Sequence, residues 1–325
     1  MYETFYNLKR SPFDITPDPS FLFPTKRHNE ALAALYYGVR WRKGFVVLTG
    51  QVGTGKTLLL RCLLQLLKQS KDVAYAYLFS SRLSPTEFLQ YIVSDFGLPS
   101  AGKNKGELLF DLCNFVVNRG LNKLTTVLIV DEAHHLSVEA LEEVRLLTNL
   151  ETAEQKLLQI VLVGQPELDE KLDSVKLTQL KQRIAIRSHL EPLSFDETRG
   201  YIERRLNLAA GDSRAEKIFP PLTVSSVYRH SRGIPRLINT ICENALISAY
   251  AKQLPGVTPE IIDEIARDFR LNVVRPAEVE KTSGLDEIDL QRAARILLDL
   301  YASVQKPLTR EAEALAPVVA RARQA

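Results

Sequence analysis

The sequence predicts an α/β fold, a parallel sheet with flanking helices, followed by a smaller domain that is wholly helical. Two observations carry this prediction. Apolar and β-branched runs alternate with helical patterns up to about residue 192, and two of these runs, Thr126–Val130 and Gln159–Val163, suit strands buried on both faces. From Ser194 onward only helical patterns follow, and the first of these is amphipathic.

Composition sets broad limits on the class of protein. The 325 residues carry 42 Lys and Arg against 39 Asp and Glu, so the net charge of +3 neither requires nor excludes a nucleic-acid partner. Three cysteines lie far apart in apolar helical patterns, as expected of reduced core residues. No run is long enough to span a membrane and no signal-peptide core is visible, so we expect a cytoplasmic protein, held at the inner membrane only through a partner.

The chain divides into four expected parts. Residues 1–27 are rich in aromatics and prolines and form an arm that packs on the α/β core, which itself covers residues 28–192. Residues 193–270 form the helical lid domain, and residues 271–325 form a helical or partly disordered tail. His28, near the start of the first helix, is interpreted as an ordinary surface residue.

A phosphate-binding loop lies between the first strand and the next helix. The apolar run Phe45–Leu48 ends at Gly50, and the leucine-rich helix Leu58–Leu67 follows Thr57, which gives Gly50-x-x-x-x-Gly55-Lys56-Thr57 the strand–loop–helix context of a P-loop. Glycines let backbone N–H groups turn inward around phosphate oxygens, and the new helix directs its positive end at the same anion. The residues expected to contact the nucleotide are Gly50, Gln51, Val52, Gly53, Thr54, Gly55, Lys56, Thr57 and Leu58.

Each polar residue of the loop has an expected role. Lys56 is expected on the β and γ phosphates, and the Thr57 hydroxyl is expected to ligate Mg²⁺, so the loop predicts a nucleotide with Mg²⁺ and leaves open which nucleotide it is. The alternative is a glycine-rich turn that merely joins a strand to a helix. The correct flanking strand and helix argue against that alternative.

Two adjacent carboxylates end the strand Thr126–Val130. Because successive side chains of a strand point to opposite faces, Asp131 is expected to hold Mg²⁺ while Glu132 orients and polarises the attacking water. The alternative is that both acids only cap the next helix, and four apolar residues before Asp-Glu, downstream of a P-loop, argue against it. His134 and His135 follow, and we assign them no chemistry.

Three further positions are candidates. Gln165 follows the strand Gln159–Val163 and either contacts the γ-phosphate or the water, or is a simple turn residue. Arg183 and Arg187 lie four apart and share one face of a helix or strand; either one neutralises charge on a neighbour's γ-phosphate, or both belong to a solvated basic face. Arg236 begins a lid helix and is placed to reach back to the phosphates.

Several longer motifs point to a family. They are M-Y-x-x-F-Y-x-L-x-x-x-P-F at the start, T-P-D-P-x-F-L-F, N-L-E-T, K-L-L-Q-I-V-L-V-G-Q-P-E-L and G-I-P-R-L-I-N. Together with the P-loop they resemble the AAA+ ATPases of the general secretion pathway protein A (ExeA-like) family, whose relatives include exopolysaccharide-locus, exosortase-locus and transposition ATPases. The resemblance covers about residues 1–270.

The resemblance implies roles for the candidate residues. Lys56 and Thr57 correspond to Walker A, Asp131 and Glu132 to Walker B, and Gln165 to sensor 1. Arg183 is the preferred arginine finger, with Arg187 in reserve, and Arg236 is sensor 2. The catalytic set is then Glu132, Lys56, Arg183 and Gln165, and the family implies ATP hydrolysis in a homo-oligomer whose sites lie between subunits.

The client of the machine stays open. Secretion-type members usually continue into a membrane span and a periplasmic peptidoglycan-binding domain, and the sequence shows neither. We therefore expect either a separate membrane-anchored partner or a different machine. The leading interpretation is an oligomeric motor or assembly factor for secretion or polysaccharide export, and the alternative is a nucleotide-switched, DNA-associated regulator of the transposition type. A third interpretation, a P-loop kinase acting on a small molecule, suits the Asp-Glu pair less well.

Overall fold

A computed structural model describes residues 1–79, 83–210 and 215–271 of the chain. It contains a five-stranded sheet with the order β2-β3-β4-β1-β5, in which all four neighbouring pairs are parallel. The strands are β1 (Phe45–Gly50), β2 (Val73–Leu78), β3 (Thr125–Val130), β4 (Leu158–Gly164) and β5 (Ile186–Leu190). The predicted parallel α/β sheet is confirmed, and β1 lies between β4 and β5.

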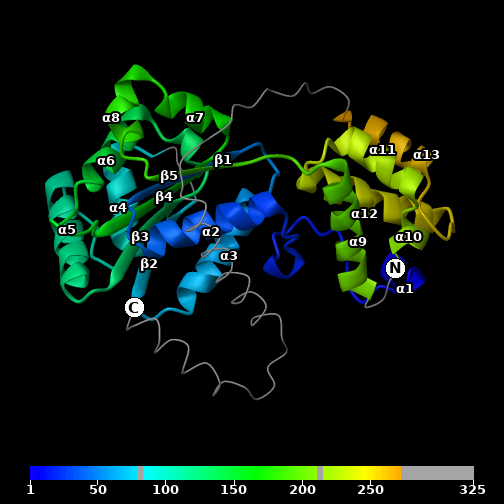
Figure 1. The fold of residues 1–325 in the computed structure, drawn as a ribbon, viewed down its shortest axis with the longest axis horizontal. Coiled ribbons are helices and arrows are strands. Elements are labelled where there is room, and N and C mark those ends of the chain that lie inside the picture. The colour runs from blue at the N-terminus through cyan, green and yellow to red at the C-terminus, as the bar shows by residue number, and fades with distance from the viewer. Residues whose placement is uncertain (80–82, 211–214, 272–325) are drawn as a thin grey trace, which may run out of the picture.

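Helices cover both faces of the sheet (Figure 1). They are α2 (Lys26–Arg40), α3 (Lys56–Lys68), α4 (Pro85–Asp95), α5 (Lys105–Leu121), α6 (Val138–Leu147), α7 (Pro166–Leu172) and α8 (Thr178–Lys181), with short 3-10 turns η2 (Ala133–His135) and η3 (Val175–Leu177). The sequence pattern predicts a helix over Val138–Leu150, and α6 ends three residues earlier, at Leu147. The sequence did not predict α7 or α8.

Alternation along the strands sorts the sheet's side chains into two cores. Val46 and Leu48 of β1 face one cluster, which α2 and α3 complete, while Phe45 and Val47 face the other, which includes residues of α4, α5 and α6. Every residue of β1, β3 and β4 is buried. Apolar strands covered on both faces therefore bring their carboxyl ends to one edge, where ligands of open α/β sheets bind.

Side-chain caps fix where several helices begin. Ser84 and Glu87 form the predicted capping box of α4, and Ser194 and Glu197 form the second one, with Ser194 N–H donating to Glu197 Oε2 at 2.8 Å and Glu197 N–H donating to Ser194 Oγ at 3.2 Å. A third box, Asn104 with Glu107, begins α5 two residues earlier than predicted.

The helical domain packs beside the sheet domain. It comprises α9 (Phe195–Ala210), α10 (Ala215–Ile218), α11 (Pro221–Ser231), α12 (Pro235–Ala251) and α13 (Pro259–Asp268). Figure 1 shows these helices grouped away from the sheet, with the N-terminus among them. The predicted tail helix at Ile288–Val304 lies outside the described residues. Among the described residues, no helix is both long and apolar enough to cross a membrane.

The N-terminal arm corrects a prediction. It contains α1 (Tyr2–Phe5) and the 3-10 turn η1 (Pro19–Phe21). The arm was expected on the α/β core, but its first part is buried in the core of the helical domain, through Tyr2, Tyr6, Leu8 and Phe13. Only the later part, at Leu22, joins the core of α2 and α3. The reason is that the helical domain leaves an apolar face that these aromatic side chains complete, and sequence patterns do not show which of two cores an arm joins.

Candidate active site

A cavity of about 310 Å³ lies where the P-loop, the arm and the helical domain meet. Its lining includes Val52, Gly53, Gly55, Lys56, Thr57 and Leu58 from the loop and α3, Glu132 from the segment after β3, Ile15, Thr16 and Pro17 from the arm, and Tyr201, Arg205, Pro235, Arg236 and Asn239 from the helical domain. One cavity therefore brings together residues more than 200 positions apart in sequence.

The loop backbone has the shape that its glycines permit. Gly53 and Gly55 have φ of 82° and 106°, in the region that side chains rarely adopt. A Cβ on Gly53 would lie 2.7 Å from Arg236 Cβ, so this glycine also allows α12 to approach the loop. Lys56 Nζ donates to the carbonyls of Gly50 at 2.6 Å and Gln51 at 2.9 Å. Burial lowers the pKa of Lys56, and the carboxylates of Glu132 and Asp131 oppose that effect.

His28 contacts the backbone of this loop, and the sequence interpretation did not predict this contact. His28 is buried rather than exposed, with 6% of its surface accessible. Its Nε2 lies 3.0 Å from the carbonyl oxygen of Thr54, and its Nδ1 lies 2.7 Å from Thr25 Oγ1. Because a carbonyl only accepts, Nε2 must carry the proton, and Nδ1 accepts from the Thr25 hydroxyl. Burial lowers the pKa of His28, in agreement with this neutral form.

Thr57 and Asp131, the two residues expected to ligate Mg²⁺, are in contact. Thr57 Oγ1 donates to Asp131 Oδ2 at 3.2 Å, although the two residues come from α3 and from the end of β3. Tyr77 on β2 donates its hydroxyl to the same carboxylate oxygen at 3.0 Å, a contact that the sequence interpretation did not include. Burial raises the pKa of Asp131, and the Tyr77 hydrogen bond opposes it. A hydroxyl and a carboxylate oxygen on neighbouring elements are donors that Mg²⁺ accepts.

The backbone of Glu132 has an unusual conformation. Its φ is 52°, in the left-handed region that is uncommon for a side chain of this size. Its N–H donates to Asp131 Oδ1 at 2.9 Å, and its side chain is among those that line the cavity. The turn therefore separates the two carboxylates, one buried against Thr57 and one at the cavity.

Gln165 lies beside Glu132, in the turn that precedes α7. Its Nε2 is 3.4 Å from Glu132 Oε2, and its backbone N–H is 3.4 Å from His134 Nδ1. His134 Nδ1 is in turn 3.4 Å from Glu132 Oε2. Parallel strands β3 and β4 bring these three residues together, because their carboxyl ends are neighbours.

The three arginines occupy different places. Arg236 lines the cavity, and its backbone N–H donates to the Gly53 carbonyl at 3.2 Å. Arg183 follows α8 and donates to Thr148 Oγ1 at 2.7 Å, outside the cavity lining. Arg187 lies on β5 and forms an ion pair with Asp169 of α7 at 2.8 Å. Arg183 and Arg187 therefore do not lie on one helix or strand, and the prediction that they share one face of such an element is wrong.

The sequence of this chain matches a known domain family and resembles two known proteins. Residues 39–172 match the model of the AAA domain family. The chain is 46% identical over 254 residues to general secretion pathway protein A of Aeromonas hydrophila, which covers 78% of this chain and 45% of that protein. It is also 33% identical over 115 residues to the Mu-like prophage DNA transposition protein B of Haemophilus influenzae, covering 35% of this chain and 36% of that one. The chain thus spans less than half the length of both relatives.

Solved structures share the fold at low identity. The ORC2 protein of Aeropyrum pernix, solved as ADPNP-ADP complexes, aligns with a TM-score of 0.60 at 20% identity, covering 82% of this chain and 75% of that one. Cdc6p of Pyrobaculum aerophilum aligns with a TM-score of 0.60 at 16% identity, covering 99% and 89%. The family match and the 46% identity show that the chain carries an AAA domain and is related to general secretion pathway protein A, and the solved structures show the same fold.

Proposed function

We propose that this protein binds ATP with Mg²⁺ and hydrolyses it. The observation that carries the proposal is the contact of Thr57 with Asp131. Thr57 directly follows the glycine loop, and it lines the cavity together with Lys56. A loop of backbone N–H groups, a helix N-terminus and a lysine recognise a polyphosphate, and the hydroxyl–carboxylate pair holds the ion that accompanies it. When bound, Mg²⁺ offsets phosphate charge.

Glu132 is the proposed base for the attacking water. It lines the cavity that Lys56 and Thr57 also line, whereas Asp131 contacts the Thr57 hydroxyl and would hold the ion. Gln165 Nε2, at 3.4 Å from Glu132 Oε2, restrains that carboxylate and is the proposed sensor of the γ-phosphate. Arg236 approaches the loop from α12, so movement of the helical domain would carry this arginine toward or away from the phosphates.

Arg183 is the proposed finger that acts on a neighbouring subunit. It lies outside its own chain's cavity, and its hydrogen bonds go to the neutral groups of Thr148 and Asn149, which compete weakly with a phosphate. The Glu151 carboxylate acts on Arg183 through Coulombic attraction. Arg187 is engaged by the carboxylate of Asp169, which makes it the poorer candidate. The active unit is then a homo-oligomer with sites between subunits.

A mixing experiment tests the shared site. Lys56→Ala and Arg183→Ala subunits are each expected to be inactive alone, and a one-to-one mixture should recover activity, because about a quarter of randomly assembled interfaces pair an intact loop with an intact arginine. Arg199→Ala, an exposed arginine of α9, serves as the matched control in place of Arg183→Ala. A mixture as inactive as its parents would refute a finger acting between subunits.

We further propose that hydrolysis drives a secretion, export or related envelope machine through a protein client or a membrane-anchored partner. The likeness to general secretion pathway protein A supports this assignment. Retention of the protein by membranes from its own host, dependent on ATP and lost on Lys56→Ala, is the expected result. Equal retention with and without nucleotide would contradict a nucleotide-driven interaction.

The likeness to a DNA transposition protein favours a second candidate, a DNA-associated regulator switched by the nucleotide. Filter binding of duplex DNA at two salt concentrations separates the candidates, since phosphate contacts predict binding that falls steeply with salt. Tight, ATP-dependent and salt-sensitive binding would favour the regulator over the envelope machine.

A further inference from the structure

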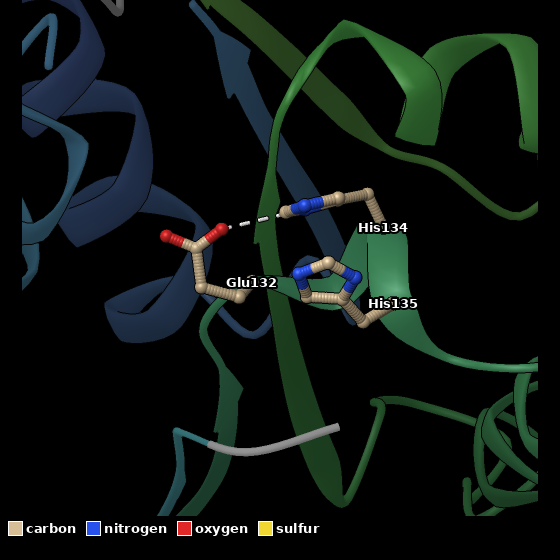
Figure 2. A group of neighbouring side chains, drawn as sticks. All are labelled: Glu132, His134 and His135. Carbon is tan, nitrogen blue, oxygen red and sulfur yellow. Dashed lines mark ion pairs between the residues drawn. The ribbon is translucent and has the colours of Figure 1, made fainter. Parts of the chain in front are cut away.

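Glu132, His134 and His135 form a compact cluster at the turn after β3. Figure 2 shows the Glu132 carboxylate, from the residue before η2, beside the imidazoles of His134 and His135, with the ion pair of Glu132 and His134 marked. One donor atom from each residue lies within 4.8 Å of the others. The two imidazole rings lie against each other, with centroids 4.0 Å apart. In the proposed hydrolysis Glu132 is the base, and neither histidine has an assigned role.

The spacing within the cluster resembles that of metal ligands more than that of a hydrogen bond. Glu132 Oε2 and His134 Nδ1 are 3.4 Å apart. Charge-assisted hydrogen bonds are shorter, about 2.7–2.9 Å. Two donors bonded to one tetrahedral ion at about 2.0–2.2 Å lie about 3.4 Å from each other. The pair therefore already has the separation that a shared ion requires.

The surroundings hold the His134 ring beside Glu132. His134 is 8% exposed, and its Nε2 has no hydrogen-bond partner among the described residues. Its Nδ1 is the ring nitrogen that lies near Glu132 Oε2, and a neutral imidazole binds a metal through the lone pair of one ring nitrogen. Lys171 Nζ donates to the carbonyls of His134 at 2.5 Å and Leu136 at 2.9 Å, which holds the turn in place.

The cluster is also open to solvent on one side. The Glu132 side chain is 40% exposed, and His135 is an exposed residue. An ion can therefore reach the three donors from solution, and water can complete its coordination, as in sites with three protein ligands.

We propose that Glu132, His134 and His135 bind a divalent transition-metal ion of the zinc type, and that the bound ion stops ATP hydrolysis by occupying the carboxylate that activates water. Two imidazoles and one carboxylate suit zinc, whereas Mg²⁺ prefers oxygen ligands such as those at Thr57 and Asp131. The ion therefore leaves the phosphate-binding residues free, so ATP still binds. The inhibitory half of this inference rests on the proposed function, and the site itself does not.

Direct titration tests the site without reference to activity. The untagged full chain, free of nucleotide and Mg²⁺, is titrated with ZnCl₂ in a calorimeter, and one ion per chain is expected. His135→Asn should weaken zinc binding by about tenfold or more, because one of three protein ligands is lost. His230→Asn is the matched control, since His230 pairs with Asp263 in the helical domain and should leave the site intact. Absence of zinc binding, or equal binding by His135→Asn, overturns the site.

Turnover measurements then test the inhibition. At saturating Mg²⁺ and ATP, zinc should inhibit the wild-type protein, and the concentration for half-inhibition should rise about tenfold in His135→Asn, with unchanged turnover in the absence of zinc. Binding of a fluorescent ATP analogue should survive zinc in both proteins. Inhibition that is equal in both proteins points to replacement of Mg²⁺ at Thr57 and Asp131, and overturns the inhibitory role. A chain that binds zinc at His135 but hydrolyses no ATP refutes the proposed function and leaves the site standing.

Discussion

The two ends of the cavity are built in different ways. The end at the P-loop, where the phosphates are expected and which we call the phosphate end, comes from one continuous segment, residues 52–58, together with Glu132 after β3. The opposite rim comes from three segments far apart in sequence: residues 15–17 of the arm, Tyr201 and Arg205 of α9, and the start of α12.

This difference separates the part of the cavity that local sequence defines from the part that only the tertiary structure defines. At the phosphate end the expected phosphate-binding groups are backbone N–H groups, so glycine spacing and a helix start suffice to define it. At the rim, side chains act only after the arm has docked. Arg205 Nη1 donates to the Pro12 carbonyl at 2.7 Å, and its guanidinium lies over the rings of Phe21 and Tyr201 at 4.7 and 5.0 Å. Substitutions at the phosphate end should therefore act on chemistry, and substitutions at the rim on docking.

The largest expected effect lies at the phosphate end. Lys56→Ala should lower ATP affinity about a hundredfold or more, because the loss of a buried charge-assisted contact with a phosphate is not replaced by water. Calorimetry with ATP and Mg²⁺ measures it. Lys68→Ala, at the exposed end of the same helix, is the control, and equal affinities of the two variants would contradict the loop assignment.

An effect of similar size is expected of Glu132→Gln on turnover. We expect ATP binding to persist while hydrolysis falls about a hundredfold to a thousandfold, since the amide retains the shape of the side chain but not its basicity. Phosphate release and nucleotide affinity are measured together. Glu139→Gln, an exposed change on α6, provides the comparison, and an unaffected turnover in Glu132→Gln removes this residue from the mechanism.

Phe13→Ala probes the rim through stability. Phe13 has no exposed surface and packs edge-on against Phe219 with ring centroids 5.7 Å apart. Truncation of a buried phenylalanine costs about 3–5 kcal/mol of the free energy of unfolding. Urea denaturation of the full chain measures this loss. Phe110→Ala removes a ring that is 67% exposed, and if both variants lost the same stability, the arm would not be docked as described.

His28→Ala should have a smaller effect on affinity. The change removes the Nε2 contact with the Thr54 carbonyl, so the loop keeps its sequence but loses a support, and we expect ADP affinity to fall about tenfold. Fluorescence titration with a labelled ADP measures this, with His230→Ala as control. A loss of stability with unchanged affinity would show that His28 supports the helix α2 alone.

The smallest effect is the dependence of stability on pH. Burial lowers the pKa of His28, His134 and His189, so at acidic pH the unfolded chain binds more protons than the folded one. Their contribution is present above the unfolded pKa of about 6.5 and is lost as pH falls through that value toward the lower folded pKa. His28→Asn should therefore lose less stability than wild type between pH 7 and pH 5.

The variant must be compared with wild type, because Asp131 changes the stability with pH in the direction opposite to that of the histidines. Its raised pKa makes the folded chain bind the proton more readily, which favours the folded state as pH falls. Urea denaturation of both proteins at the two pH values isolates the histidine. Parallel losses of stability in the two proteins would show that His28 does not titrate differently on folding.

Particular residues show how far sequence reasoning reached. The predicted meeting of Thr57 and Asp131 appears in the structure, because each residue ends or begins an element whose type was readable from apolar periodicity. His28 and Tyr77 were missed. A histidine near a helix start and a tyrosine in an edge strand carry no signal of their contacts with Thr54 and Asp131.

By itself, the sequence determined the parallel sheet, the glycine loop at its edge and the pair of carboxylates after β3, since these depend on patterns within one segment. The tertiary structure decided that the arm joins the helical domain, that Arg183 and Arg187 separate, and that two histidines meet Glu132. The physical reason is that apolar burial is not directional, so a sequence shows which faces must be covered but not which segment covers each of them.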